Sequence, residues 1–275
     1  MLTALRHRVT RPGEIIVIGL TLAPVAVLVG LPIFSLVRQS LDHGGAGYTN
    51  LATTPLGASN SGFHALWTSI QIATVAAVIA TGLGLALATA VTRPRQPRRT
   101  GRTTTRLTES LSALPLGVSA VTVGFGFLIV FDSPPLNIRT SWWIIPIAHA
   151  LIAFPFVVRA TVPALRSIDP HQREAAALLG AGPARVWREI DARIVARAAA
   201  VATGFAFAIS LGEFGATLFI VRPDTTTAPV AIFRFLSRPG ATNVDQAMAL
   251  ATLLALMTGI VAFLSERLIR VRRSA

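Results

Sequence analysis

Six long apolar runs, separated by polar segments, dominate the pattern of hydrophobic and polar positions along this chain. They cover residues 15–37, 65–91, 107–131, 142–163, 195–221 and 247–269. A helix that crosses a membrane needs roughly 20 apolar residues, and each run reaches or approaches that length. The pattern predicts an all-α integral membrane protein with six transmembrane helices in one domain, residues 1–275. The first run is too long for a signal peptide and lacks a small-residue cleavage site, so we expect it to be the first span.

The polar interruption at residues 169–190 is the one that still has helical character. Asp169 is suited to cap a helix whose first turn contains Pro170. Gly180 and Gly182 favour a turn soon afterwards, and Pro183 can open a second helical segment. The pattern therefore predicts a short helix, a tight turn and another helix between the fourth and fifth spans.

The first of these two helices carries a compact apolar patch. Ala175, Ala176, Leu178 and Leu179 lie close together at helical spacing, and alanines allow another backbone to approach closely. Such a patch is typical of a docking surface. A helical turn in an ordinary polar loop between membrane helices would give a similar pattern, so both interpretations stay open on the pattern alone.

Composition agrees with a membrane protein, because 52% of the residues are hydrophobic and only 13% are charged. The chain has no cysteine, which excludes disulfides, thiolate metal sites and cysteine nucleophiles. Its formal net charge is +13. In a soluble protein this charge would suggest nucleic acid, but here the arginines follow the membrane topology. We therefore expect membrane lipid, and no nucleic acid, among its partners.

The distribution of arginines predicts the orientation. Nineteen lie before the first span, in the loops at 93–106 and 166–197, or in the C-terminal tail, and five lie on the opposite side. The remaining one, Arg159, falls within the fourth span. Because cytoplasmic segments are enriched in arginine, both termini and the polar stretch at 169–190 are expected in the cytoplasm.

Glu213 is the carboxylate that lies well inside a predicted span, within the run Ser210-Leu211-Gly212-Glu213. An unpaired charge there costs about 2.5 to 3.5 kcal/mol on insertion scales. Ser210, Gly212 and Glu213 are therefore candidates for a translocation pathway. The alternative is that Glu213 pairs with an arginine or caps a broken helix. His149, in the fourth span, is interpreted as a packed helix residue and not as a metal ligand.

The run Glu174-Ala175-Ala176, followed by Gly180 and Ile190, resembles the EAA loop of permease subunits of binding-protein-dependent type I ABC importers. The family pattern continues from the isoleucine to a Leu-Pro pair, whereas this chain reads Asp-Ala-Arg over residues 191–193. The resemblance implies that the loop at 167–193 contains a coupling helix, which docks in a cleft of the ATPase and transmits its movement to the spans. The implied coupling residues are Glu174, Ala175, Ala176 and Gly180, supported by Gly182 and Ile190.

Residues 107–268 resemble the conserved core of these permeases. The eight residues from Ser210 and the nine residues from Thr225 look most like the ferric-iron and thiamine permease group, with sulfate and molybdate permeases as near neighbours. The resemblance implies a permease half in the bacterial plasma membrane, not an enzyme. Its implied partners are a second half, identical or related, two ABC ATPase subunits and an extracytoplasmic solute-binding protein. No cofactor is expected on this chain, because ATP and Mg²⁺ would bind the ATPase and no G-x-x-x-x-G-K-[ST] phosphate loop is present.

Other functions stay open at this point. An ion-coupled secondary transporter or a channel subunit would have several buried ionisable groups, and this chain offers little beyond Glu213. A membrane-embedded enzyme would need a nucleophile or metal cluster, and the five histidines lack ligand spacing. The outer segment at 222–245 contains a short apolar run, residues 230–233, which we expect on the membrane surface or against a partner.

Overall fold

The computed structural model of the chain describes residues 12–53, 61–92 and 117–270, and within these ranges all regular secondary structure is helical. The long helices are α1 (Pro12–Ser40), α3 (Gly62–Thr92), α6 (Ile144–Arg166), α9 (Ala192–Leu211) and α12 (Ala241–Arg270). The shorter α-helices are α2 (Ala46–Thr53), α5 (Ala120–Val130), α7 (Pro170–Leu178), α8 (Pro183–Val186), α10 (Thr217–Ile220) and α11 (Ala228–Leu236). A π-helical turn (Trp187–Asp191) joins α8 to α9.

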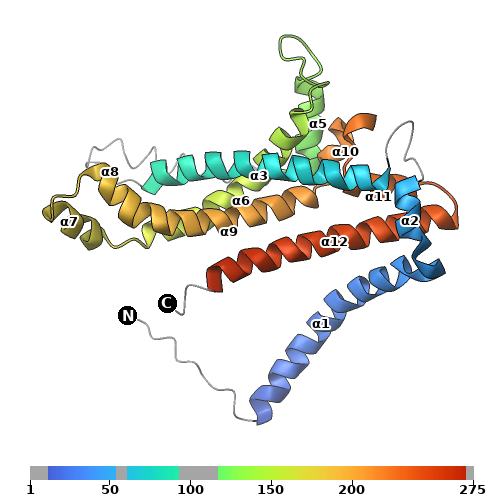
Figure 1. Cartoon of the computed structure of the whole chain (residues 1–275), viewed down its shortest axis with the longest axis horizontal. Helices are drawn as coiled ribbons and strands as arrows, with labels where there is room; N and C mark the ends of the chain where they lie inside the picture. Colours follow the sequence, from blue (N-terminus) through green and yellow to red (C-terminus); the bar gives the residue numbers. More distant parts are fainter. Residues whose placement is uncertain (1–11, 54–60, 93–116, 271–275) are drawn as a thin grey trace.

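The centre of the molecule is a bundle in which α3, α6 and α9 lie side by side with α12 along them (Figure 1). Helices α7 and α8 lie at one end of this bundle, which we call the loop end, and α2 and α11 lie at the other, the far end. The interface of α3, α6 and α9 is lined by buried alanines, among them Ala76, Ala153 and Ala206. At Gly84 a Cβ atom would stand 2.4 Å from Val157 Cγ1 of α6. Small residues therefore let these helix backbones approach closely, as in other membrane bundles.

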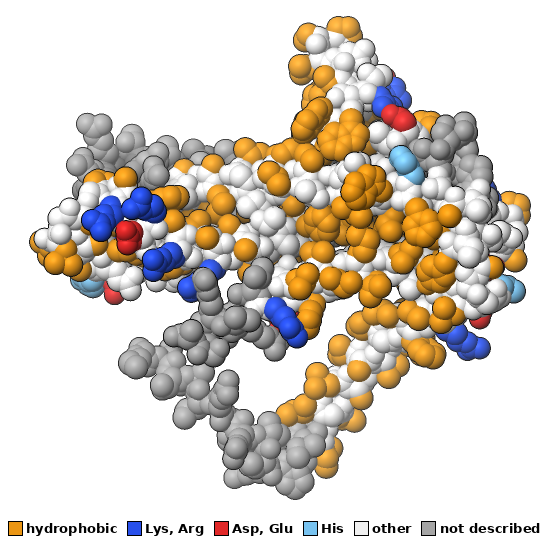
Figure 2. Space-filling model, in the orientation of Figure 1, with side chains coloured by type: hydrophobic (Ala, Val, Ile, Leu, Met, Phe, Trp, Pro, Cys, Tyr) orange, Lys and Arg blue, Asp and Glu red, His pale blue; other side chains and the backbone are white. Residues whose placement is uncertain are grey.

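Helix α1 contacts α12 and leans away from the rest of the bundle (Figure 1). No part of its most apolar window is buried inside the chain, and leucines such as Leu20 and Leu28 are exposed. Figure 2 shows hydrophobic side chains along the sides of the long helices and arginines gathered near α7 and α8. An apolar surface of this extent is typical of contact with lipid or with another membrane subunit.

Five helices in the described part of the chain are long and apolar enough to cross a membrane. They correspond to the first, second, fourth, fifth and sixth predicted spans. In the third predicted span, 107–131, the structure shows α5, which has 11 residues and begins after the extended residue Ser119, and residues 107–116 lie outside the described ranges. The count of six spans therefore stays a prediction, and so does the orientation. The arginine-rich loop at 93–106 lies outside the described residues.

The fifth predicted span, 195–221, is interrupted near its C-terminal end, as the broken-helix alternative for Glu213 allowed. Helix α9 ends at Leu211 and α10 begins at Thr217, so the span is interrupted over residues 212–216. At its other end, the helix continues backwards without a break through the π-helical turn to Pro183. The mean hydropathy of a window hides the Gly-Glu-Phe-Gly run, because its neighbours are apolar. The two glycines nevertheless favour a break, since each weakens a helix by roughly 1 kcal/mol.

The apolar run at 230–233 also differs from its predicted position. It belongs to α11, whose Val230, Ala231 and Phe235 are fully buried. Ala231 and Phe235 pack with Leu51 of α2 and Leu250 of α12 in one core cluster. The chain itself therefore covers Val230 and Ala231, whereas Phe233 stays 48% exposed.

Candidate functional site

The 167–193 loop folds as the sequence predicts around α7. The Asp169 side chain accepts a hydrogen bond from the His171 backbone N–H at 2.9 Å, and Pro170 occupies the first turn. At the other end, Ala181 N–H donates to the Ala176 carbonyl and Gly180 N–H to the Ala177 carbonyl, both at 3.0 Å. Gly180 has φ +81°, the left-handed backbone that this Schellman-type ending requires. Local hydrogen bonds therefore define both ends of the helix.

The predicted docking patch lies on the outside of the molecule. Leu178 and Leu179 are each 89% exposed, and Glu174 and Ala175 are exposed beside them. Ala176, on the adjoining face, is half-buried. Two neighbouring leucines this open to solvent lose a large part of the hydrophobic stabilisation that burial would give, about 1.5 to 3 kcal/mol per side chain. This exposure is the property that a docking surface needs.

Gly182 and Ile190 occupy different surroundings from the exposed patch. Gly182 is the N-cap of α8, in extended backbone. Ile190 packs against the cluster of Ala88, Leu165 and Val195, which joins α3, α6 and α9 at the loop end. Ile190 therefore anchors the second half of the loop to the bundle. The structure groups it with the core and not with Glu174.

An ion pair that the sequence analysis did not identify closes the base of the loop. Arg173 Nε donates to Asp191 Oδ1 at 2.9 Å, and the two side chains are only 28% and 14% exposed. Arg173 lies in α7 and Asp191 in the π-helical turn, so the pair ties the first helix of the loop to the start of α9. A groove of about 660 Å³ adjoins this pair. It is lined by Arg173, Ala177, Ala181, Pro183, Ala184, Val186, Trp187 and Asp191.

The second candidate region is the helix break between α9 and α10. Glu213 Oε1 accepts a hydrogen bond from the Ala216 backbone N–H at 2.7 Å. Of the alternatives for Glu213, the structure therefore shows the carboxylate capping a broken helix. Gly212 is exposed, whereas Ser210 is buried and its hydroxyl lies 2.7 Å from His149 Nδ1. His149 is buried as expected, but it also bonds across the break.

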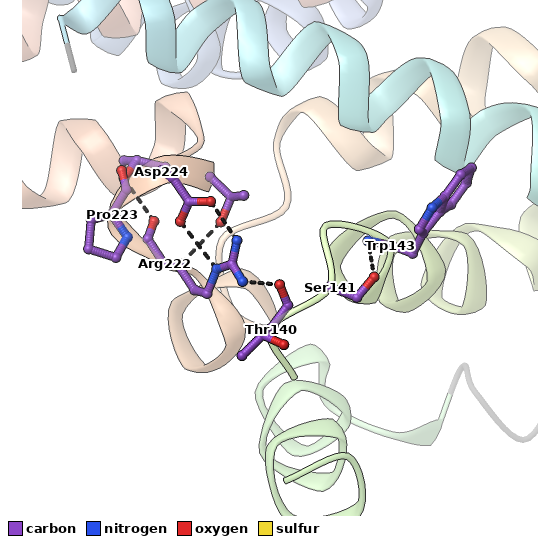
Figure 3. Close-up of polar contacts among 8 residues, drawn as sticks. Thr140, Ser141, Trp143, Arg222, Pro223 and Asp224 are labelled. Atoms are coloured by element: carbon purple, nitrogen blue, oxygen red, sulfur yellow. Dashed lines mark hydrogen bonds and ion pairs between the residues drawn. The ribbon is translucent and has the colours of Figure 1, made fainter. Parts of the chain in front are cut away.

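An arginine fastens the segment that follows α10 to the start of α6. Figure 3 shows the Arg222 guanidinium between the Asp224 carboxylate and the backbone carbonyl of Thr140. The hydrogen bond from Arg222 lowers the pKa of the Asp224 carboxyl. Beside it, Trp143 N–H donates to Ser141 Oγ at 3.3 Å. The segment that follows the C-terminal end of α10 is therefore held to the connection between α5 and α6.

The two predicted sets of site residues lie at opposite ends of α9 (Figure 1). Helix α9 has 20 residues and thus a length of roughly 30 Å. The structure does not bring Glu174 and Glu213 together, but it connects them through one continuous helix from Pro183 to Leu211. Any movement of the loop would act along this helix on the break.

Comparison with known proteins identifies the family of this chain. Residues 80–273 match the family model described as binding-protein-dependent transport system inner membrane component. The sulfate transport system permease protein CysT of Salmonella typhimurium is 30% identical, and the alignment covers 93% of this chain and 94% of CysT. The molybdenum transport system permease protein ModB of Escherichia coli is 28% identical, over 77% of this chain and 95% of ModB.

A solved structure shows the same fold. A chain in the crystal structure of a bacterial alginate ABC transporter, in complex with its alginate pentasaccharide-bound periplasmic protein, superposes with a TM-score of 0.73 at 15% identity. The superposition covers 93% of this chain and 94% of that one. The family match, CysT and ModB confirm the predicted importer permease. They do not support its placement in the iron and thiamine group, because their names are those of the neighbouring sulfate and molybdate permeases. The chain belongs to the family of inner membrane components of binding-protein-dependent transport systems, as a multi-pass inner membrane permease component of an ABC importer.

Proposed function

We propose that this chain is one of two permease halves that together form the translocation pathway of an ABC importer. It has six spans with both termini in the cytoplasm, and it binds no cofactor itself. Two separate ATPase subunits supply ATP hydrolysis, and an extracytoplasmic binding protein delivers the solute. Family membership supports this division of labour. The exposed apolar surface of α1 supports a second membrane subunit beside it.

The ATPase docks on α7, with Glu174, Ala175, Ala176 and Gly180 at or next to the contact. The observation that carries this proposal is the near-complete exposure of Leu178 and Leu179 at the end of a helix that is capped at both ends. A capped helix has a defined shape before docking, which reduces the conformational entropy lost on binding. Exposed apolar side chains on such a rigid element are typical of binding surfaces.

Movement of the ATPase reaches the membrane through the continuous helix that ends at Leu211. The π-helical turn and α9 follow α8 without interruption, so they move with the loop as one element. Among the pathway candidates, Gly212 is exposed at the break and Glu213 is half-buried beside it. The hydroxyl of Ser210 is already bonded to His149, which favours a structural role for that residue.

The proposed solute is a small tetrahedral oxyanion of the sulfate or molybdate type. Support comes from CysT and ModB, two relatives that cover most of the chain. Arg234, near the far end, is half-buried, and it donates a hydrogen bond to the Thr226 hydroxyl at 2.8 Å. A guanidinium held by a neutral hydroxyl keeps donors for an anion. Iron(III) and thiamine, which the sequence motifs favour, are the competing solutes.

Uptake assays distinguish these solutes. The chain is expressed with its partner subunits in cells that lack their own sulfate and molybdate importers, and uptake of radiolabelled sulfate is measured. Uptake is expected to exceed that of cells without the chain by at least about tenfold, and excess molybdate should compete with it. Uptake of iron(III) or thiamine that neither oxyanion reduces would instead assign the chain to the iron and thiamine group.

A further inference from the structure

His149 bonds through both ring nitrogens to hydroxyls on the two sides of the helix break. Its Nδ1 atom lies 2.7 Å from Ser210 Oγ, in the last turn of α9, and its Nε2 atom lies 2.6 Å from Thr217 Oγ1, the first residue of α10. The side chain is fully buried, and it comes from a third helix, α6. One imidazole therefore joins the two halves of the interrupted span to a continuous neighbour.

The hydrogen bonds around Thr217 are consistent with one tautomer. The Thr217 hydroxyl donates to the Glu213 carbonyl at 3.3 Å, so its single proton is used there. His149 Nε2–H then donates to Thr217 Oγ1, and Nδ1 accepts from the Ser210 hydroxyl. In this arrangement a neutral imidazole uses its one donor and its one acceptor, which satisfies both nitrogens inside the bundle.

An apolar side chain at position 149 would leave both hydroxyls able to bond within their own segments. Serine and threonine in membrane helices bond readily to the carbonyl four residues earlier, and Thr217 already does so. The hydroxyls therefore do not require His149, whereas a buried imidazole requires them. What the histidine adds is a link between three segments.

The position of this link completes the connection between α6 and α9. The 167–193 loop joins the two helices at the loop end, where Arg173 and Asp191 close its base. Their alanine faces pack together in the bundle, and His149 joins them again near the break. Without this second link, α9 could slide along α6 when the loop is displaced, because alanine interfaces have little interdigitation.

We infer that His149 is a positioning residue for transport, which makes α6, α9 and α10 move as one body when the ATPase displaces the loop. The inference rests on the proposed docking of the ATPase at α7. Beyond the break, α10 is held to α5, where Gly124 allows its backbone to touch Ala216. The Arg222 contact to Thr140 holds the segment that follows. Through the His149 link, movement of α9 reaches α10 and α5 instead of being absorbed at the break.

Spin labels on either side of the break test this inference. The chain has no cysteine, so Phe205→Cys on α9 and Leu218→Cys on α10, both exposed, give one labelled pair. Distances are measured by double electron–electron resonance in the complex with the ATPase, with and without ATP and Mg²⁺. With His149 present, the distance should be the same in both states. In His149→Phe, which conserves the ring but removes both nitrogens, it should shift by about 2 to 5 Å between the states, as helices in switching proteins do.

A second substitution tests the link in case His149→Phe impairs folding. Thr217→Val removes the α10 side of the link and should produce the same nucleotide-dependent shift. Thr203→Val is the matched control, because Thr203 bonds to Thr81 of α3 at 3.0 Å and lies away from the break. It should leave the distance unchanged. His149→Asn, which keeps a donor and an acceptor, should restore most of the original behaviour.

A shift with nucleotide in the parent chain, or no shift in both His149→Phe and Thr217→Val, would overturn the inference. Failure of the parent chain to capture the ATPase is a separate result. That result would overturn the proposed docking at α7, on which the inference rests. Co-purification tests for it before any distance is measured.

Discussion

Replacing both Leu178 and Leu179 with aspartate is expected to abolish solute uptake while the protein still folds and inserts. Each leucine is 89% exposed, so its substitution leaves the core of this chain unaffected. If both are buried in the ATPase cleft, their loss removes roughly 3 to 6 kcal/mol of apolar burial and places two carboxylates in an apolar site. Affinity for the ATPase should then fall by at least about a hundredfold. Co-purification in detergent and uptake by cells measure the two consequences.

The control for this pair is a leucine with similar chemistry in a different place. Leu136 is 53% exposed and lies between α5 and α6, away from the loop end. Leu136→Asp should leave capture of the ATPase unchanged. If the double variant at 178 and 179 captures the ATPase as well as the parent chain does, these leucines are not at the contact.

Reversing one charge of the Arg173–Asp191 pair is expected to reduce uptake, and exchanging both charges should restore most of it. The side chains are less than one third exposed, so their separation should cost more than the ~0.2–1 kcal/mol of a surface pair and less than the ~3–5 kcal/mol of a fully buried one. Arg173→Asp or Asp191→Arg alone places like charges at the two positions that now form the pair. Each should loosen α7 from α9 and lower uptake about fivefold to thirtyfold.

A double-mutant cycle separates this effect from a general effect of charge. The uptake rates of both single variants and the exchanged variant give the coupling energy between the two positions. Arg185 and Glu189 provide the matched pair on the same loop, with side chains 70% and 48% exposed and atoms 3.6 Å apart. Reversal at Arg185 should change uptake little. An exchanged variant no better than the single variants would show that the ion pair does not hold the loop.

The first half of the loop could be predicted from the sequence because its signals are local. Asp169, Pro170 and Gly180 act within four residues of the positions they define, so the helix ends follow from short-range hydrogen bonding. The Arg173–Asp191 pair could not be predicted in this way. Its members are 18 residues apart, and their contact depends on how α7 folds back against the π-helical turn.

The break in the fifth span could be predicted only in part from the sequence. Hydropathy gave no sign of where the helix stops, because Leu211 and Phe214 are apolar and offset the polar residues in any window. The cost of a buried carboxylate did indicate that Glu213 needs a partner, and capping was one of the alternatives. That the partner is the Ala216 N–H, and that His149 bonds across the same break, depends on tertiary packing.

Family-level features were predicted more successfully than the subgroup. The EAA-like run is compact and lies in a defined place between two spans, which gives it high information content. The motifs from Ser210 and Thr225 lie in segments whose residues also serve packing. Val230 and Ala231, for example, are fully buried in the chain's own core. Similarity in such segments therefore reports the common fold more than the solute.

Site-specific crosslinking between α7 and the ATPase tests the central claim most directly. Ala175→Cys supplies the one thiol in this cysteine-free chain, at an exposed position of α7. Single cysteines are placed around the cleft of the partner ATPase, and Ser237→Cys, exposed near the far end, is the control. We expect a crosslink from position 175 whose yield changes with ATP, and none from position 237. A folded complex in which position 175 gives no crosslink, or in which both positions crosslink equally, would contradict docking of the ATPase on α7.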